Sequence, residues 1–406
     1  MNIGIVTTWF ERGAAYVSRQ FMDVLQRTDE VYIYARGGEK YAKGDPKWDL
    51  PNVTWGVRNL AKMRQISMMY IDKKDFKKWI DKNKIEILLF NEQQWWIPLI
   101  WCKEWGIKTV AYVDYYNELT IPLFDIYDCL ICNTLRHSFA FRKHSNARYL
   151  KWGTNVELYK PMNEIHDKIT FFNSAGMAPI RKGTDFVIKA FYGCRNRKDA
   201  KLLIHTQRPL RNTIPEIMPL VDELLKEGTM EIVEKTVSAP GLYHCADVYV
   251  YPSRLDGIGL TLMEAASSGL ACITVDNPPM NEFVEDKFGF KCKVEYQYSR
   301  NDGYYWPMCS VDLDSLTQIM EEMIAGKIDV EEMKNNARTY ALCELDFNKN
   351  MMQLSGIFNS ITMSSNNNAI TAIKEYENMG VKKLKKRLGL LFKVAALIKG
   401  ESFINR

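Results

Sequence analysis

The sequence lacks any long apolar run, any basic leader and the cysteine pattern of a secreted module. No stretch of its 406 residues reaches the ~18 apolar residues that a membrane-spanning helix needs. The opening MNIGIVTTWF has no basic stretch before its apolar residues, so we expect a first β-strand there and no signal peptide. Nine scattered cysteines cannot all pair, which favours a reducing compartment such as the cytoplasm.

The composition is that of a folded globular protein. Hydrophobic residues make up 47% and charged residues 25% of the chain, which excludes wholesale disorder. Because domains usually span ~100–200 residues, a chain of 406 residues is expected to form two.

Positive charge is concentrated at one end. Residues 363–406 contain nine Lys or Arg and three Asp or Glu, and the rest of the chain holds 45 basic and 46 acidic residues. A neutral body argues against a nucleic-acid partner. The basic end predicts contact with something anionic.

Short apolar runs alternate with helical patterns along most of the chain, which predicts parallel sheets with helices on both faces. The expected strands of the first half are Ile3–Thr7, Val31–Ala35, Ile85–Phe90, Thr109–Val113 and Cys129–Cys132, and those of the second half are Ile169–Ala175, Lys201–Thr206, Met230–Glu234, Asp247–Tyr251 and Ala271–Val275.

A polar stretch around Pro161 interrupts this pattern, and the sequence therefore predicts two doubly wound α/β domains, residues 1–160 and 161–343, facing each other across a cleft. A helix over 344–362 is expected to return toward the first domain. A flexible link and a basic amphipathic tail are expected over 363–406.

The segment from Asp247 to Val275 carries the strongest functional pattern. An expected strand ends at Tyr251, and the following loop holds Asp256 before a helix that contains Glu264. Glycines at a helix start let a ligand approach the backbone, and the N–H groups there favour a phosphate. The two carboxylates suit sugar or ribose hydroxyls. The same pattern also fits an ordinary capped helix, and the residues alone leave both interpretations open.

This segment resembles the signature of the retaining family-four glycosyltransferases, which have the GT-B fold. The matching positions are Pro252-Ser253, Asp256-Gly257-Ile258-Gly259, Glu264-Ala265 and Gly269. The resemblance implies that Asp256, in place of the family's first glutamate, contacts the transferred sugar and that Glu264 binds the ribose. It assigns Gly257, Gly259 and Leu260 to donor binding.

Two further stretches extend the resemblance over residues 1–362. Trp152-Gly153-Thr154-Asn155 with Tyr159-Lys160-Pro161 looks like the family's domain link, and residues 176–183 (GMAPIRKG) look like its diphosphate-binding loop. Lys182 matches the family's lysine and is expected to serve both catalysis and donor binding. Met177 stands where an arginine is expected, and the neighbouring Arg181 is predicted to supply that charge. A solvated surface pair is the alternative for Arg181 and Lys182.

The first half offers weaker candidates. Gly13 follows the first strand and is predicted to admit the donor phosphate or the acceptor, although an ordinary tight turn fits equally well. Asp114 occupies the place of the family's histidine and is a catalytic candidate, with a helix N-cap as the alternative. Asn91 and Glu92 leave a strand at the same edge and are acceptor-side candidates, or simply polar loop residues.

No cofactor or metal site is expected. Cys129 and Cys132 lie inside an apolar run, which is typical of a buried strand, and no clustered set of His, Cys and carboxylate residues is apparent in the sequence. The tryptophans at 95, 96, 101 and 105 are expected in the core, although Trp95 could line an acceptor site.

Apolar residues from Val381 to Ile398 repeat at helical spacing, with lysines and Arg387 between them. This predicts a basic amphipathic helix that attaches to an anionic membrane surface. Docking onto the first domain or pairing with a second subunit are the alternatives.

The sequence therefore predicts a retaining, metal-independent hexosyl- or N-acetylhexosaminyl-transferase that uses a nucleotide-diphosphate sugar. Its expected acceptor is a glycan or lipid-linked precursor at the cytoplasmic face of a membrane, and base recognition is expected near Glu234-Lys235-Thr236. A nucleotide-sugar epimerase on the same fold and a non-catalytic nucleotide-sugar-binding partner subunit at the membrane are the alternatives.

Overall fold

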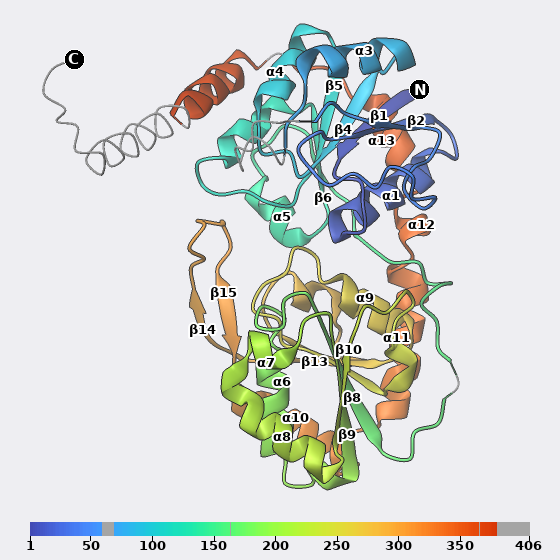
Figure 1. Cartoon of the computed structure of the whole chain (residues 1–406), viewed down its shortest axis with the longest axis vertical. Helices are drawn as coiled ribbons and strands as arrows, with labels where there is room; N and C mark the ends of the chain where they lie inside the picture. Colours follow the sequence, from blue (N-terminus) through green and yellow to red (C-terminus); the bar gives the residue numbers. More distant parts are fainter. Residues whose placement is uncertain (59–68, 163, 365, 380–406) are drawn as a thin grey trace, which may run out of the picture. The chain divides into compact units, whose positions relative to one another are not determined.

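The computed structural model describes residues 1–58, 69–162, 164–364 and 366–379 (Figure 1). The chain forms two compact units. Of these described residues, unit 1 contains those of Met1–Ile131, Phe141–Arg148 and Leu354 onward, and unit 2 contains those of Cys132–Ala140 and Tyr149–Gln353. Each unit is built around one sheet.

The sheet of unit 1 has seven strands in the order β3-β2-β1-β4-β5-β6-β7, and the pairings from β3 through β6 are parallel. The strands are β1 (Asn2–Thr7), β2 (Glu30–Ala35), β3 (Val53–Trp55), β4 (Ile87–Asn91), β5 (Lys108–Tyr112), β6 (Cys129–Cys132) and β7 (Ala147–Tyr149). Helices α1 (Gly13–Leu25), α3 (Lys73–Asn83) and α4 (Ile97–Glu104) connect them.

The sheet of unit 2 has six parallel strands in the doubly wound order β10-β9-β8-β11-β12-β13. They are β8 (Ile169–Gly176), β9 (Ala200–Thr206), β10 (Met230–Glu234), β11 (Val248–Tyr251), β12 (Ala271–Val275) and β13 (Gly289–Cys292). An antiparallel hairpin follows, formed by β14 (Val294–Tyr298) and β15 (Met308–Val311).

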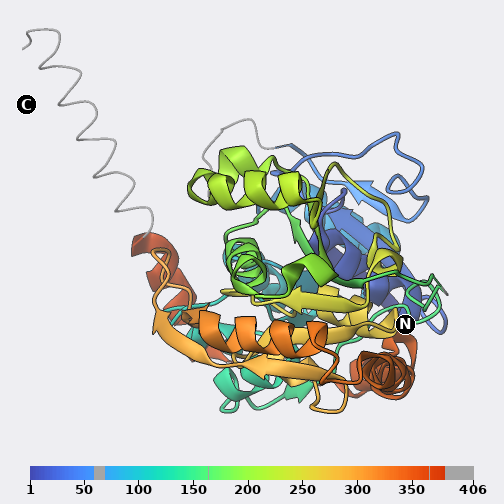
Figure 2. The ribbon, with the colours of Figure 1, turned by 90° about the horizontal axis from the view of Figure 1, so that it is seen from below.

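Helices cover both faces of the second sheet (Figures 1 and 2). Helix α6 (Thr184–Gly193) packs with α8 (Met218–Glu227) and α10 (Leu313–Ile324), and α9 (Leu260–Ser267) packs with α11 (Val330–Glu344). The short α7 (Leu210–Thr213) lies between β9 and α8 in the chain. With both faces covered, the central strands are rich in apolar residues, and β11 and β12 are completely buried.

The predicted α/β fold class is confirmed. All ten expected strands form, with ends within two residues of those predicted. The strands missed by the sequence are the three-residue β3 and β7, together with β13, β14 and β15. β3 and β7 have only three residues, β13 and β15 are interrupted by Lys291 and Ser310, and β14 is exposed and polar, so none of them gives a clear apolar run.

The unit boundaries differ from the expected domain limits. Residues 132–140, which include α5 (Leu135–Ala140), cluster with unit 2, although they were expected in the first domain. The single helix expected over 344–362 is two helices, α12 (Phe347–Asn350) and α13 (Leu354–Ser360). Asp346 starts α12 anew because its carboxylate accepts hydrogen bonds from the backbone of Asn348 and Lys349.

The segment after α13 is held against unit 1, in contrast to the flexible link expected there. The backbone N–H of Ser364 donates to Asp128 at 2.6 Å, and Lys103 Nζ donates to the Ser364 carbonyl at 3.2 Å. Residues 367–379 are helical, with Ala369 and Ile373 buried. The predicted basic helix from Val381 onward lies outside the described residues. Within the described ranges, none of the helices combines the length and apolar character that a bilayer crossing requires.

Candidate active site

Two loops of unit 2 meet beyond the carboxyl ends of β8 and β11, where parallel sheets bind their ligands. The first loop is residues 177–183, between β8 and α6, and the second is residues 252–259, between β11 and α9. Gly183 ends the first loop with a φ of +73°, and a Cβ there would lie 2.2 Å from the carbonyl oxygen of Pro252 in the second. The backbone N–H of Arg254 donates to the carbonyl of Arg181 at 2.8 Å. Glycine is therefore required at position 183, because only its missing side chain lets the loops touch.

A buried ion pair fixes this arrangement to α6. Both terminal nitrogens of Arg254 donate to the carboxylate of Asp185 at 2.7 Å. A two-pronged pairing of this kind sets orientation as well as distance. The second loop is thereby locked to the first turn of the helix that follows the first loop.

The two loops bring Lys182 and Asp256 into direct contact. Lys182 Nζ and the hydroxyl of Tyr251 both donate to Asp256 Oδ2, and the side chains of Lys182 and Asp256 are each 15% exposed. The backbone N–H of Gly257 donates to the other carboxylate oxygen at 2.8 Å. The two residues that the sequence assigned to the diphosphate and to the sugar therefore lie in one cluster.

The charges of this cluster shift each other's protonation. Burial opposes ionisation of Asp256, yet the charges of Lys182 and Arg181 and the hydrogen bonds hold the pKa of this carboxyl well below its usual range. Burial lowers the pKa of Lys182, although the negative charge of Asp256 acts in the opposite direction. Arg181 NH1 lies 3.8 Å from Asp256, and its side chain is 41% exposed. Arg181 is therefore the accessible cation of the loop.

Helix α9 begins directly beside this cluster. Gly259 precedes it with a φ of +86°, which glycine adopts without strain, and Leu260 is its first residue. The first N–H groups of a helix lack acceptors within the helix, and its dipole attracts negative charge. Gly257, Gly259 and Leu260 therefore lie where an anionic group can be bound.

Glu264 lies inside α9 and is held by two tyrosines. The hydroxyl of Tyr243 donates to Glu264 Oε2 at 2.6 Å, and Tyr159 also donates to this carboxylate. Burial raises the pKa of Glu264, and the two tyrosines and the charge of Lys182 only partly offset this. Glu264 and Lys182 therefore act on each other electrostatically, as members of one site.

The sequence analysis missed Arg136 and His137, which support the second loop from α5. Arg136 donates to the carbonyl of Asp256 at 2.6 Å, and His137 Nε2 lies 3.3 Å from the carbonyl of Gly257. Burial and the neighbouring Arg136 push the pKa of His137 well below its usual range, so this ring is neutral. Glu282 accepts from the N–H groups of Leu135 and Arg136 at the start of α5.

Met177 does not take over the missing arginine's role. It follows β8 and is 56% exposed, and its thioether carries no charge. The positive charge of this loop comes from Arg181 and Lys182, and the part of Arg181 in place of the family's arginine stays a prediction.

The candidates of the first half lie in unit 1. Asn91 is 1% exposed, and its amide donates to Ala14 and Ser18 of α1 at 2.8 Å, so this side chain ties β4 to α1. Glu92 accepts from Arg12 at 3.1 Å. Glu92 and Asp114 line one small pocket. Gly13 opens α1, and a Cβ there would meet nothing within 4 Å. The structure therefore groups Glu92 with Asp114 and leaves Asn91 out of reach of a ligand.

Comparison with known proteins agrees with this geometry. Residues 168–298, which include the Lys182, Asp256 and Glu264 cluster, match the model of the family described as glycosyl transferases group 1. The resemblance to a glycosyltransferase family predicted from the sequence is confirmed, and the matching segment lies in unit 2. No curated protein sequence matches this chain.

Solved glycosyltransferase structures share the GT-B fold with most of this chain. A glycosyltransferase from Rickettsia africae has a TM-score of 0.71 at 15% identity, over 90% of this chain and 99% of that one. The Anabaena protein HepE in complex with UDP has a TM-score of 0.68 at 14% identity, over 89% and 100%. WaaG, a glycosyltransferase involved in lipopolysaccharide biosynthesis, has a TM-score of 0.62 at 13% identity, over 87% and 99%.

Proposed function

We propose that this protein is a retaining glycosyltransferase that moves a hexosyl or N-acetylhexosaminyl group from a nucleotide-diphosphate donor to a hydroxyl acceptor. The observation that carries this proposal is the cluster of Lys182, Asp256 and Arg181 at the start of α9, with Glu264 behind it. Cations and a helix N-terminus suit a diphosphate, and the two carboxylates suit the hydroxyl groups on either side of it.

Each residue has a definite place in the proposed donor complex. Glu264 binds the ribose hydroxyls, and Asp256 binds the transferred sugar. Lys182 and Arg181 neutralise the diphosphate, together with the N–H groups around Gly259. UDP is our first choice of nucleotide because HepE was solved in complex with it, and base recognition is assigned to the loop after β10, near Lys235.

The proposed reaction exchanges one carbon–oxygen bond for another on the same face of the sugar. The bond between the anomeric carbon and the diphosphate oxygen breaks, and the acceptor oxygen bonds to the same carbon. The acceptor's proton passes to the departing diphosphate. The chain's contribution is positioning and stabilisation of the negative leaving group. Because Lys182 and Arg181 supply that charge, the proposal needs no metal in this site.

The acceptor side is assigned to unit 1. Asp114 and Glu92 share a pocket there, and Asp114 is proposed to hydrogen-bond the transferring sugar. Gly13 at the start of α1 leaves open space, which would admit donor or acceptor. The burial of Asn91 gives it a supporting part in this side of the site.

A membrane-presented, lipid-linked glycan is the proposed acceptor. The basic residues from Val381 onward favour attachment to anionic lipid at the cytoplasmic face. The fold shared with WaaG is consistent with such an acceptor.

Product analysis tests the proposal. The protein is incubated with a panel of UDP-sugars, with and without lipid-linked acceptors, and the products are followed by mass spectrometry and by NMR of the anomeric proton. We expect UDP release that depends on acceptor and a product with the donor's anomeric configuration. A free epimer formed from donor alone would show an epimerase instead. Donor binding without turnover on any acceptor would show a non-catalytic subunit, and inversion would refute the retaining mechanism.

A further inference from the structure

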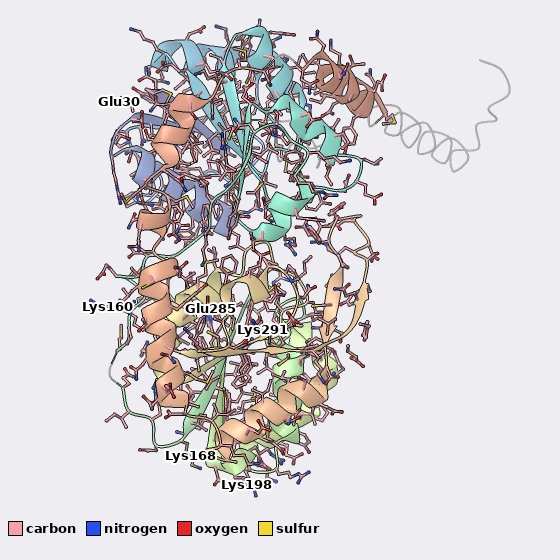
Figure 3. The ribbon with its side chains drawn as sticks, turned by 180° about the vertical axis from the view of Figure 1, so that it is seen from behind. Glu30, Lys160, Lys168, Lys198, Glu285 and Lys291 are labelled. Atoms are coloured by element: carbon pink, nitrogen blue, oxygen red, sulfur yellow. The ribbon has the colours of Figure 1, made fainter. Side chains whose placement is uncertain are left out.

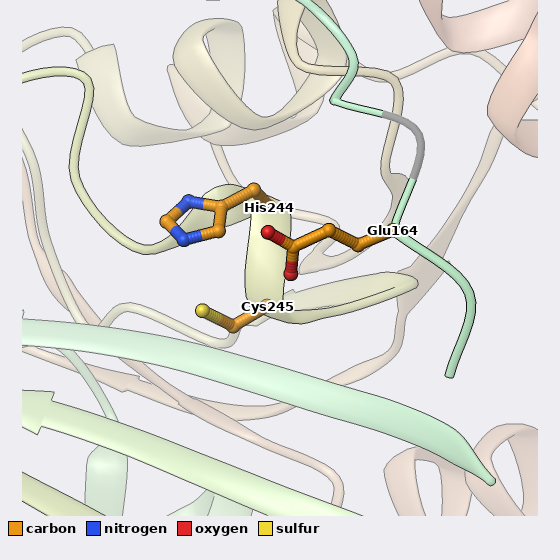
Figure 4. A group of neighbouring side chains, drawn as sticks. All are labelled: Glu164, His244 and Cys245. Carbon is orange, nitrogen blue, oxygen red and sulfur yellow. The ribbon is translucent and has the colours of Figure 1, made fainter. Parts of the chain in front are cut away.

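A second group of ligand-type side chains lies in unit 2, away from the cluster described above. His244 and Cys245 are neighbours in the short helix η4 (Tyr243–Cys245), and Glu164 lies in the segment that leads into β8. The imidazole nitrogen, the thiol sulfur and a carboxylate oxygen all lie within 4.8 Å of one another. Figure 4 shows the carboxylate of Glu164 directed toward the two side chains of η4.

We propose that Glu164, His244 and Cys245 form a binding site for a borderline-soft divalent cation, with Zn²⁺ as the best fit. Thiolate and imidazole ligands select zinc over the oxygen-preferring Mg²⁺ and Ca²⁺, and three protein ligands leave a fourth, tetrahedral position to water. The sequence analysis found no such set because Glu164 is 80 positions away from His244 in the chain.

The geometry needs only a small contraction to hold the ion. Ligand atoms of a tetrahedral zinc with bonds of 2.0–2.3 Å lie about 3.3–3.7 Å apart. The observed ligand atoms all lie within 4.8 Å of one another, so the longest separation has to close by at most about 1.1–1.5 Å. Glu164 is exposed and His244 and Cys245 are half-buried, so the carboxylate has room to move inward while the helix keeps the other two in place.

The surroundings of the three residues also suit a ligand. Cys245 lines a pocket of about 500 Å³ at the amino ends of β8, β9 and β10, the edge marked by Lys168 and Lys198 in Figure 3. His166 lines the same pocket, and its buried Nε2 has no hydrogen-bond partner among the described residues. This edge is opposite to the carboxyl ends that carry the Lys182 and Asp256 cluster, so the metal site is separate from it.

The metal site would act on Glu264 through the residues next to it. Tyr243 precedes His244 in η4, and Tyr159 lies five positions before Glu164, and both tyrosines bond the carboxylate of Glu264. A cation that ties Glu164 to η4 therefore restrains Tyr243, which belongs to η4 with two of the proposed ligands. This consequence rests on the proposed function, whereas the metal site itself does not.

Calorimetric titration with Zn²⁺ alone tests the site directly. The full chain is used without an affinity tag, stripped with EDTA and kept reduced. We expect one site per chain, and Cys245→Ser and His244→Ala are each expected to weaken binding by at least about tenfold, with Glu164→Gln also weaker. Cys343→Ser is the matched control, because Cys343 is an exposed free cysteine in the same unit and its loss should change nothing. Unchanged melting temperatures show that each variant folds.

Two further readouts make the result decisive. Co²⁺ should give a thiolate-to-metal charge-transfer band in the wild type that is absent in Cys245→Ser. Excess Mg²⁺ should not displace the bound zinc, because Mg²⁺ prefers oxygen ligands to thiolate and imidazole. No zinc uptake by the wild type, wild-type affinity in Cys245→Ser, or a loss in Cys343→Ser would overturn the proposal.

The link to Glu264 is tested separately by titrating UDP with and without zinc. We expect tighter UDP binding in the zinc-loaded wild type and no effect of zinc in Cys245→Ser. Equal UDP affinity in both wild-type states would refute the restraint on Glu264. Failure to bind UDP under any condition would instead count against the proposed function.

Discussion

Glu264 faces two opposing requirements, because its surroundings favour the neutral acid and its proposed role needs the carboxylate. Burial raises its pKa, and hydrogen bonds from Tyr243 and Tyr159 restore only part of the ionised form's stability. A carboxylic acid whose pKa is higher in the folded than in the unfolded state makes its full contribution to stability at pH values below the unfolded-state pKa. That contribution is lost as the pH rises through the folded pKa.

We therefore predict opposite effects of Glu264→Gln on stability and on binding. At neutral pH the unliganded variant should unfold at a higher temperature than the wild type, because no buried carboxylate has to ionise. This difference should vanish at acidic pH. UDP affinity should fall by roughly tenfold to a hundredfold at neutral pH, because a hydrogen bond to a charged group contributes ~1.5–3 kcal/mol. Thermal melts and calorimetry at several pH values measure both.

Glu227→Gln is the matched control for this experiment, because Glu227 pairs with Arg197 in unit 2 and takes no part in the site. It should leave UDP affinity unchanged. A Glu264→Gln variant that binds UDP like the wild type would remove Glu264 from the donor site.

Lys182 is expected to contribute to stability as well as to binding. Lys182→Ala leaves the largely buried Asp256 without its nearest cation, and breaking a buried pair costs 3–5 kcal/mol. We expect the free energy of unfolding, measured with denaturant, to fall by about 3 kcal/mol. This is the lower end of that range, because Arg181 remains 3.8 Å from Asp256.

Lys151→Ala breaks the more exposed pair with Glu344 and should cost less than ~1 kcal/mol. The double variant Lys182→Ala/Asp256→Ala should lose less than the two single changes added together. Equal losses for Lys182→Ala and Lys151→Ala would show that the Lys182 pair is not a buried one.

At this scale the resemblance to the family's signature singled out Lys182, Arg181, Asp256 and Glu264, and the structure places Lys182, Arg181 and Asp256 in one cluster. Arg136 and His137 could not be predicted in the same way. Their partners are backbone carbonyls 120 positions away, and a carbonyl leaves no trace in the sequence.

At the scale of elements, glycines decide how closely the two loops approach. Gly183 precedes α6 and Gly228 ends α8, and both have a φ of +73°. A Cβ at 183 would clash with Pro252, whereas a Cβ at 228 would meet nothing within 4 Å. Substitutions at these two positions therefore distinguish the stability cost of a left-handed backbone from the stability cost of a steric clash between the loops.

We predict that Gly228→Ala destabilises the protein by about 1–2 kcal/mol, the cost of a left-handed non-glycine residue. Gly183→Ala should cost clearly more and should also weaken UDP binding, because the loops must separate. Denaturant unfolding and calorimetry provide the comparison. Equal stability losses in the two variants would contradict the close loop contact.

Strands were predicted where buried apolar runs lie in the middle of a sheet, as in β11 and β12. The edge strand β10 was also predicted, whereas the edge strands β3, β7 and β13 and the hairpin were missed. In the hairpin, β14 is exposed along most of its length and alternates apolar with polar residues, so it gives no continuous apolar run. The helix expected over 344–362 failed for a local reason, since Asp346 is an N-cap in the middle of the stretch.

At the scale of the whole chain, the described residues after α13 belong to unit 1 and the basic segment follows them. Glu377 accepts from the backbone N–H of Trp96 at 2.9 Å, and Ser364 is bound to Asp128. Sequence analysis read 363–369 as flexible because its serines and asparagines are polar. It could not foresee that Asp128 would accept a hydrogen bond from this stretch.

We predict that removing Val381–Arg406 leaves a folded protein that still binds UDP but no longer sediments with anionic vesicles. Binding of the full chain to vesicles should weaken with salt, because the screening length falls to ~3 Å at 1 M. Activity on a membrane-held acceptor should drop further than activity on a soluble analogue.

A longer truncation from Met363 onward is the control, since it also removes the contacts of Ser364 and Glu377 and should lower the melting temperature. If the shorter truncation aggregates or loses UDP, the basic segment is part of the folded body and the membrane proposal fails.

The most direct test of the donor site is UDP titration of Lys182→Ala, Arg181→Ala and the double variant, with Lys151→Ala as the control. The account predicts that Lys182→Ala weakens UDP binding by roughly tenfold or more, by more than Arg181→Ala, and that the double variant is weaker still. Lys151→Ala should bind like the wild type. Near-wild-type UDP affinity in a folded double variant would contradict the account, because the loop between β8 and α6 would then not face the diphosphate.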